Sequence, residues 1–453
     1  MKVLLISANT ETTPYPVYPL GIDYVAGAIE HRHRVFVTDI NETGDTSALA
    51  DRVREVSPDV IGISIRNIDN TDVKSPKTYI DRHRSLISTI RQITRAPVVL
   101  GGSGFTLFPG RLMEALQADY GIIGEGERFS DFLEALENQA DVTGLPGVIT
   151  RSETSVKTIS YPAPWQGELA RRFDPESPHV AYYLKKGGML SIQTQRGCPF
   201  HCIYCTYPHI EGRRLRKSPP QAAGRTARML QDAGAGYLFV TDSVFNADPE
   251  HSMAVARAFQ KAGVTIPWGA YISPVRPPKD YFRVLADAGM THVEFGTEAF
   301  CDAVLENYQK PFRTADIFDA HRAAVKAGLN TAHFFLLGAP AETPRTLSET
   351  LDNAGKMEKT VCFFFAGIRI YPHTRLYEIA AASGKIPEDQ ELLTPCFYEP
   401  EGISLAQIEK TLQARAQNRM NWVFGAGGEK TAKILSRLHD RGHVGPLWEH
   451  LIR

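Results

Sequence analysis

The sequence is poor in cysteine, has no excess of either charge and lacks a long apolar run. Its 453 residues include six cysteines, and 50 basic side chains balance 51 acidic ones to a net charge of −1. This balance argues against a broad electrostatic grip on nucleic acid or anionic lipid. The longest apolar stretch covers only residues 361–368, whereas a membrane-spanning helix needs about 20. Because the N-terminus shows no secretory signal pattern, we expect a cytoplasmic protein that is not a disulfide scaffold.

What the sequence does contain is an alternation of strand and helix patterns. The length predicts about three structural units. In residues 1–140, glycine-rich or polar loops follow the apolar strand patterns. This predicts a doubly wound, Rossmann-like α/β domain with its ligand site at the carboxyl ends of the strands. The predicted strands cover residues 2–7, 33–39, 60–65, 97–100 and 120–123.

The alternation stops and then resumes. Residues 141–187 are rich in proline and are predicted to be an irregular linker. Residues 188–390 hold about six βα units, which predicts a partial, TIM-like barrel with its active-site groups at the strand C-termini. Residues 391–453 are predicted to form a small, mainly helical C-terminal region. The barrel strands are predicted at 190–194, 237–241, 266–270, 292–296, 332–337 and 364–370.

Three of the six cysteines form a cluster directly after the first predicted barrel strand. Cys198, Cys202 and Cys205 have the spacing Cys-x3-Cys-x2-Cys. Three thiolates can bind three irons of a cubane cluster and leave the fourth iron open. A zinc site is the alternative, with His201 as a possible further ligand. The spacing and the aromatic Tyr204 before the last cysteine favour the iron–sulfur cluster.

This motif resembles the hallmark of the radical S-adenosylmethionine (SAM) enzymes. The resemblance extends over roughly 188–375 and implies a 4Fe-4S cluster that reductively cleaves SAM to a 5′-deoxyadenosyl radical. One motif departs from the family, because His373 stands where the last-strand Tyr-Pro-Gly-Thr has glycine. By resemblance, the SAM-binding residues are Tyr204, Asp242, Ser243, Gly296, Thr297, Glu298, Gly338 and Tyr371.

The N-terminal domain resembles the cobalamin-binding domain of a large radical SAM subgroup. The usual lower-ligand motif Asp-x-His-x-x-Gly is absent, and the corresponding loop contains Arg66. A permanent cation cannot ligate cobalt, so the resemblance implies cobalamin without a protein ligand. The alternative is a vestigial domain in which Arg66 and Asp69 form a surface ion pair. The candidate cobalamin-binding residues are Tyr18, Ser64, Arg66, Asn67, Gly101, Gly102, Ser103, Gly124, Glu125 and Gly126.

The predicted function is a cobalamin-dependent radical SAM methyltransferase acting on a small natural product or metabolite. The first alternative is a non-methylating radical SAM enzyme that dehydrates a sugar or aminoglycoside diol, epimerises or rearranges its substrate. A second is a non-catalytic metal-binding or scaffold protein. A reductant such as flavodoxin, ferredoxin or a dedicated reductase is the expected partner, and neither nucleic acid nor a membrane is expected.

No general base can be chosen from the sequence, but several residues are candidate substrate contacts. Glu211, Arg213 and Arg214 follow the cluster loop and fit either a cavity lining or a solvated charge run. Cys301 and Cys362 are predicted to be buried small side chains, as is Cys396, which is the best placed of the three for a catalytic thiol. The candidate catalytic or substrate-contact residues are Tyr271, Arg369, Tyr371, Cys396, Tyr398 and Glu399.

Overall fold

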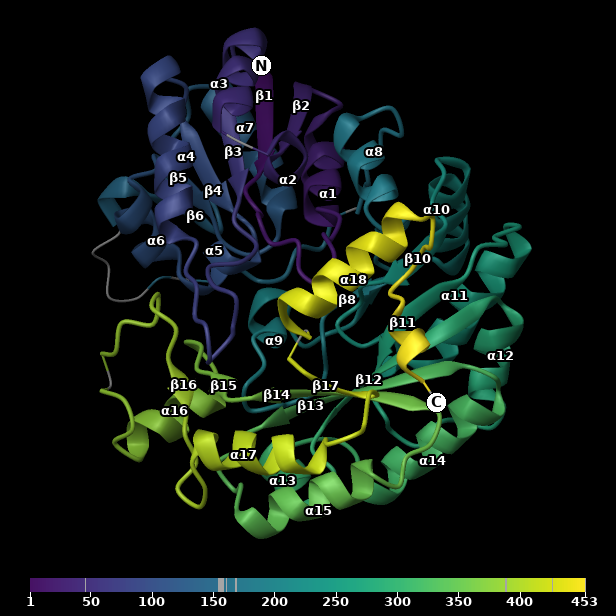
Figure 1. Ribbon diagram of the computed structural model, residues 1–453. Coiled ribbons are helices and arrows are strands. Elements are labelled where there is room, and N and C mark those ends of the chain that lie inside the picture. Colours follow the sequence, from purple (N-terminus) through teal and green to yellow (C-terminus); the bar gives the residue numbers. More distant parts are fainter. Residues whose placement is uncertain are drawn as a thin grey trace.

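The computed structural model describes residues 1–44, 46–153, 159, 161–167, 169–387, 389–425 and 427–452. Two parallel-sheet units lie side by side, one built from the first third of the chain and one from the remainder (Figure 1). Helix α18 (Gly428–Asp440) runs across the space between the two units (Figure 1). No helix among the described residues has the length and apolarity to cross a membrane.

The N-terminal unit is the predicted doubly wound domain. Its sheet has the order β2-β1-β3-β4-β5-β6, and the first five strands are parallel. Apolar side chains cover both faces of these strands, as a sheet buried between two helical layers requires. The strands are β1 (Lys2–Ser7), β2 (Arg34–Asp39), β3 (Val60–Ser64), β4 (Val98–Gly101), β5 (Tyr120–Ile122) and β6 (Val148–Thr150). The helices are α1 (Leu20–Ile29), α2 (Ile40–Thr43), α3 (Thr46–Val56), α4 (Ile80–Ile93), α5 (Ser103–Leu107), α6 (Pro109–Leu116) and α7 (Phe129–Glu137), with the 3₁₀ turn η1 (Gly126–Arg128).

The second unit is the predicted open barrel, and all seven of its strands are parallel. The order is β17-β14-β13-β12-β11-β10-β7. The strands are β7 (Met189–Ile192), β10 (Tyr237–Val240), β11 (Trp268–Ile272), β12 (Met290–Glu298), β13 (Asn330–Leu337), β14 (Thr360–Ala366) and β17 (Trp422–Phe424). The outer helices are α10 (Pro220–Asp232), α11 (Pro249–Lys261), α12 (Tyr281–Asp287), α13 (Asp302–Asn307), α14 (Thr314–Lys326) and α15 (Pro344–Ala354), with the turn η3 (Phe245–Ala247).

The C-terminal region is less helical than predicted. Its short strand β17 pairs with β14 as the seventh strand of the barrel sheet, and Trp422 packs on Phe364 with ring centroids 4.8 Å apart. The strand predicted over 364–370 is also divided, because Gly367 has a φ of +87° and separates β14 from β15 (Ile368–Arg369). The other elements of this region are α16 (Arg375–Ala382), β16 (Phe397–Tyr398), α17 (Leu405–Arg415), α18 and η4 (Trp448–Leu451).

The segment 141–187 is more ordered than an irregular linker where the structure describes it. Strand β6 extends the N-terminal sheet by pairing antiparallel with β5, and η2 (Arg151–Glu153) follows it. Helix α8 (Pro178–Lys185) packs Tyr183 against Tyr18, with ring centroids 5.4 Å apart. These apolar contacts outweigh the proline content that suggested a linker. The cluster loop is framed by β8 (Gln195–Arg196), α9 (Tyr207–Ile210) and β9 (Arg216–Lys217).

Candidate functional site

A cavity of about 300 Å³ opens where the carboxyl ends of the N-terminal strands face the barrel. Glycines keep it open: a β-carbon at Gly101 would have no neighbour closer than 3.9 Å and would project into the cavity space. Gly102 has a φ of +98°, and a β-carbon there would lie 2.6 Å from the carbonyl oxygen of Ile65. The predicted cobalamin-binding residues that line the cavity are Tyr18, Ser64, Arg66, Gly101, Gly102, Ser103, Gly124, Glu125 and Gly126. The cavity therefore suits a cofactor that needs close approach of the backbone.

A second cavity, of about 990 Å³, adjoins the first at Arg66, which lines both. Loops of the N-terminal unit, the end of β14 and helix α18 surround it, and Asn67 and Tyr371 contribute to its wall. Asn67 therefore lies beside this larger space rather than the glycine-lined one. The larger cavity has room for a small-molecule substrate.

Arg66 forms no ion pair among the described residues, and the alternative pair with Asp69 is not formed. Asp69 instead pairs with Arg369, whose Nε lies 3.0 Å from Asp69 Oδ2, and both side chains are buried. The two Nη atoms of Arg369 donate to the carbonyls of Ile370 and Leu392 at 2.6 and 2.5 Å. Arg369 was a candidate substrate contact. Its Nε and both Nη atoms instead bond to protein acceptors, and its pair with Asp69 joins the two units.

The cysteine loop is pinned by main-chain hydrogen bonds. The Cys198 N–H donates to the Gly212 carbonyl at 3.1 Å, and the Ile203 N–H donates to the Tyr308 carbonyl at 3.3 Å. Gly197 has a φ of +91°, and a β-carbon there would lie 2.4 Å from the Arg214 carbonyl. The backbone can make this turn before Cys198 only because the residue is glycine.

The cysteine thiols of the loop need a bound cation to be held as thiolates. Burial raises the pKa of the Cys198 thiol, and it raises that of Cys205 to about 12, so both would be protonated without a positive charge. Bound metal supplies that charge and holds thiols as thiolates. No three His, Cys, Asp or Glu side chains in the described part of the chain converge as a single ion requires. A cubane instead spreads three thiolates over three irons, and this donor set fits it.

A lysine that no sequence pattern indicated lies beside the cluster loop. Lys310 Nζ is 3.2 Å from Glu298 Oε1 and 5.3 Å from the ring centroid of Tyr204, and it is almost fully buried. Although burial lowers the pKa of Lys310, the charges of Glu298 and Cys202 raise it overall. Glu298 and Tyr204, both predicted to bind SAM, are thus brought together at the loop around a fixed positive charge.

Asp242 is one of the strand-end residues predicted to bind SAM, but its partners belong to the protein. Asp242 is fully buried, and its carboxylate accepts hydrogen bonds from the Thr194 N–H and hydroxyl, both at 2.6 Å, and from the Gln195 N–H at 3.2 Å. These bonds anchor the segment that leads to Cys198, so Asp242 supports the loop instead of facing a ligand. Burial raises its pKa to about 7.

Thr297 is also directed away from the predicted SAM site. Its hydroxyl lies 2.7 Å from His333 Nδ1, and His333 Nε2 lies 3.2 Å from His321 Nδ1 on helix α14. Because His321 belongs to α14, these contacts direct Thr297 toward the helical layer. Ser243 donates to Glu211 Oε2 at 3.1 Å. The SAM-binding roles of Gly296, Gly338 and Tyr371 stay predictions.

Each of the two units matches the model of a known protein family. Residues 6–133 match the model of the B12 binding domain. Residues 192–354 match that of the Radical SAM superfamily. The chain belongs to the radical SAM superfamily and carries a B12-binding domain. The predicted cofactors, a 4Fe-4S cluster, SAM and cobalamin, are therefore those of this radical SAM enzyme.

Relatives share the whole arrangement. The radical SAM enzyme is 25% identical to the tryptophan 2-C-methyltransferase of Streptomyces laurentii, over 80% of this chain and 72% of the relative. It is 23% identical to the cytidylyl-2-hydroxyethylphosphonate methyltransferase of Streptomyces wedmorensis, over 86% of this chain and 83% of the relative. The structure of the radical SAM methyltransferase TsrM from Kitasatospora setae has the same fold, with a TM-score of 0.86, 21% identity and coverage of 99% and 97%.

The barrel interior of the radical SAM enzyme holds a carboxyl group that the sequence did not single out. Val293 and Phe295 pack in the core under the helices, so Glu294 between them faces inward. Trp448 Nε1 donates to its Oε1 at 3.0 Å, and burial raises its pKa to about 7. The sequence signal that could have identified Glu294 is a single glutamate within an apolar strand pattern.

Tyr271, a candidate catalytic residue, lies on the same inner face. It pairs in register with Glu294 and is 46% exposed, although most large apolar side chains of the barrel are buried. Partial desolvation inside the barrel raises its pKa, and the charge of Glu294 raises it further. Tyr15 of the N-terminal unit has its pKa raised by the same two causes. The charge of Glu294 therefore acts on both Tyr271 in the barrel and Tyr15, which lines the larger cavity.

The remaining cysteines of the radical SAM enzyme lie apart from the cluster loop. Cys301 and Cys362 are buried as predicted, and Cys301 Sγ donates to Glu349 Oε2 at 3.2 Å. Cys396 is half-buried, and burial raises the pKa of its thiol. A raised pKa disfavours the reactive thiolate, which argues against Cys396 as a nucleophile.

Proposed function

We propose that this radical SAM enzyme is a cobalamin-dependent methyltransferase that methylates a carbon atom of a small molecule. The observation that carries the proposal is the position of the glycine-lined cavity. Its walls come from the B12-binding domain on one side and from Gln193, Arg196 and Tyr207 beside the cluster loop on the other. A cofactor in this cavity would therefore lie beside the segments that flank the cysteine loop.

When bound, cobalamin relays a methyl group and the cluster binds SAM and supplies electrons. Cys198, Cys202 and Cys205 would hold the cluster, and the glycines at 101, 102, 124 and 126 would admit cobalamin. Arg66 stands at the junction of the two cavities and cannot ligate cobalt. It would fill space beside the cofactor and keep a fixed positive charge there without occupying a coordination position.

The net reaction transfers CH₃⁺ from the SAM sulfonium to a substrate carbon, releasing S-adenosylhomocysteine and one proton. No external oxidant is needed. The proton requires an acceptor. Glu294 lines neither of the two cavities, but it lies in the barrel interior in register with Tyr271, and burial raises its pKa to about 7. We propose that Glu294 Oε2 accepts the proton while Oε1 stays bonded to Trp448. A general base works best when its pKa lies near the working pH.

A small-molecule substrate is supported by the size of the larger cavity, about 990 Å³. Because a relative is named a tryptophan 2-C-methyltransferase, L-tryptophan and related indoles are the first compounds to test. We propose that the enzyme works in the cytoplasm with a flavodoxin, a ferredoxin or a dedicated reductase as electron donor.

The test uses the full chain purified without air and loaded with iron, sulfide and cobalamin. It is incubated with reductant, SAM labelled with deuterium in its methyl group, and the indoles. We expect a product that carries the labelled methyl group, formed together with an equal amount of S-adenosylhomocysteine and only when cobalamin is present. A product that has lost water, or turnover that does not need cobalamin, would refute the proposal.

A further inference from the structure

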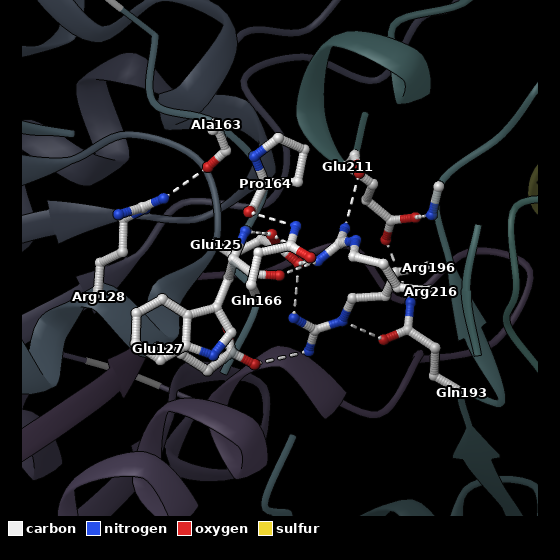
Figure 2. A network of polar contacts seen from close by, with 12 residues as sticks. Glu125, Glu127, Arg128, Ala163, Pro164, Gln166, Gln193, Arg196, Glu211 and Arg216 are labelled. Carbon is white, nitrogen blue, oxygen red and sulfur yellow. Dashed lines mark hydrogen bonds and ion pairs between the residues drawn. The ribbon is translucent and has the colours of Figure 1, made fainter. Parts of the chain in front are cut away.

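Two glutamates of the B12-binding domain and two arginines of the barrel form a buried ion network (Figure 2). Arg196 Nη1 lies 2.9 Å from Glu125 Oε1, and Arg196 Nη2 lies 2.8 Å from Glu127 Oε1. Arg216 Nη1 donates to both oxygens of Glu125 at 2.7 and 2.8 Å. The exposure of these side chains is 13% for Arg216 and less for the others. The two arginines and the two glutamates carry opposite charges in equal number, so the buried group has no net charge.

The network changes the interpretation of Glu125. Its carboxylate also accepts the Trp165 N–H at 2.6 Å, so its oxygens are engaged with protein partners. Glu125 was predicted to bind cobalamin, and it does line the glycine-lined cavity. Its contacts show that it ties the loop after β5 to the barrel.

From Arg196 the hydrogen bonds continue to the backbone that holds the cluster. Arg196 Nε donates to Gln193 Oε1 at 2.9 Å, and Gln193 Nε2 donates to Glu211 Oε1 at 3.1 Å. Glu211 Oε2 accepts the Gly197 N–H at 3.0 Å, one residue before Cys198. Arg216 Nη2 also donates to the Glu211 carbonyl at 2.7 Å. Glu211 thus belongs to this network and not to a solvated charge run.

The network therefore touches both cofactor sites. At one end Gly124, Glu125 and Gly126 border the cavity proposed for cobalamin, and at the other Gly197 leads into the first cluster ligand. Arg196 meets two carboxylates through separate Nη atoms, and its planar guanidinium holds direction as well as distance. A shift of the loop after β5 would consequently break contacts that hold the cluster loop, and the reverse is equally true.

We propose that Arg196 and Arg216 are positioning residues that couple cobalamin binding to the order of the cluster loop. Each cofactor then strengthens binding of the other by the same factor, because coupling between two sites is reciprocal. The proposal rests on the two cofactor sites and does not require that the reaction be methyl transfer.

The test measures the Kd of hydroxocobalamin for the full chain with and without its reconstituted cluster. Arg216→Lys is the informative variant, because Arg216 does not border the cobalamin cavity. The lysine keeps the charge beside Glu125 but cannot also reach the Trp165 and Glu211 carbonyls. Arg369→Lys is the matched control, since Arg369 is a buried arginine that joins the two units through Asp69 and two carbonyls.

We expect the cluster to tighten hydroxocobalamin binding by about 10-fold in the wild type and in Arg369→Lys, within the usual range of allosteric coupling. In Arg216→Lys the ratio should fall below about 2. A ratio near 1 in the wild type, or an unchanged ratio in Arg216→Lys, would overturn the proposal. Since both readouts are binding constants, failure to methylate a substrate would not affect them.

A second measurement, on the wild-type chain, tests the proposal even if Arg216→Lys does not fold. Hydroxocobalamin is added to the cluster-free wild-type chain, and amide hydrogen exchange is followed in peptides from 198–206, none of which line the glycine-lined cavity. Exchange there should slow, while peptides of α12 should keep their rate. If cobalamin leaves the exchange of 198–206 unchanged, no coupling passes through the network.

Discussion

Glu294 is buried without a cation, which makes Glu294→Gln a variant expected to stabilise the protein. No lysine, arginine or histidine in the described part of the chain forms an ion pair with Glu294, and its bond to Trp448 Nε1 is at 3.0 Å. Glutamine keeps the shape and an oxygen that can accept this bond, but it carries no charge. The variant therefore removes the cost of ionising a buried carboxyl and little else.

The magnitude follows from the pKa of Glu294, which burial raises from 4.5 to about 7. Below pH 4.5 the group is protonated in the folded and unfolded states and costs nothing. As the pH rises toward 7 the unfolded state ionises first, so the folded state loses stability, and the loss is complete above about pH 7. At about 1.4 kcal/mol per pKa unit, Glu294→Gln should gain about 3 kcal/mol at pH 8 and about 1 kcal/mol at pH 5.

The assay is calorimetric unfolding of the cofactor-free chain across this pH range. For a unit of the barrel's size, 1 kcal/mol shifts Tm by about 2–4 °C, so the variant should melt about 6–12 °C higher at pH 8. Glu449→Gln is the control. Burial alone would raise the pKa of Glu449, but His292, 3.2 Å away, lowers it overall, so this variant should lower Tm. If Glu294→Gln showed no gain, or a gain that did not grow with pH, the carboxyl would not be a strained buried acid.

Three further predictions concern the cofactor sites and the contact between the units. Gly101→Val should fill the glycine-lined cavity and reduce the cobalt bound per chain, while iron per chain, measured in the same sample, stays unchanged. Lys310→Met removes the positive charge beside the cluster thiols, so a redox titration followed by electron paramagnetic resonance should show a lower cluster potential; an unchanged potential would place Lys310 outside the cluster's electrostatic field. Arg369→Met leaves Asp69 buried and unpaired and should cost about 3–5 kcal/mol in urea unfolding, most of which Asp69→Asn in the same chain should restore.

The sequence was sufficient for the parallel strands and for the cluster, because both are local signals. Apolar strand patterns between helices fix a doubly wound domain and a barrel, and the spacing of three cysteines within one loop needs no knowledge of the fold. Strand β17 was missed because three residues, Trp422–Phe424, give no periodicity. Its pairing with β14 depends on contacts across the molecule.

Side-chain partners were the part that the sequence could not supply. Arg369 was proposed to contact the substrate, but its partner Asp69 lies 300 positions earlier in the chain. Glu125 looked like a cofactor residue because its loop is glycine-rich, and only the fold shows that Arg196 and Arg216 meet it. Lys310 stands in no motif, and its role follows from a position 3.2 Å from Glu298.

The buried carboxylates of the enzyme differ in whether a cation meets them. Between the units, three of them meet arginines: Glu125 and Glu127 meet Arg196, and Asp69 meets Arg369. Such pairs fix a geometry at little net gain in stability, which suits the placement of two cofactor sites. Inside the barrel, no cation in the described part of the chain pairs with Glu294, and burial raises its pKa to about 7. Asp242 is also a buried acid without a cation, but its oxygens accept bonds from Thr194 and Gln195, whereas Glu294 has the bond from Trp448. This difference is the reason to look for the chemistry beside Glu294 and Tyr271.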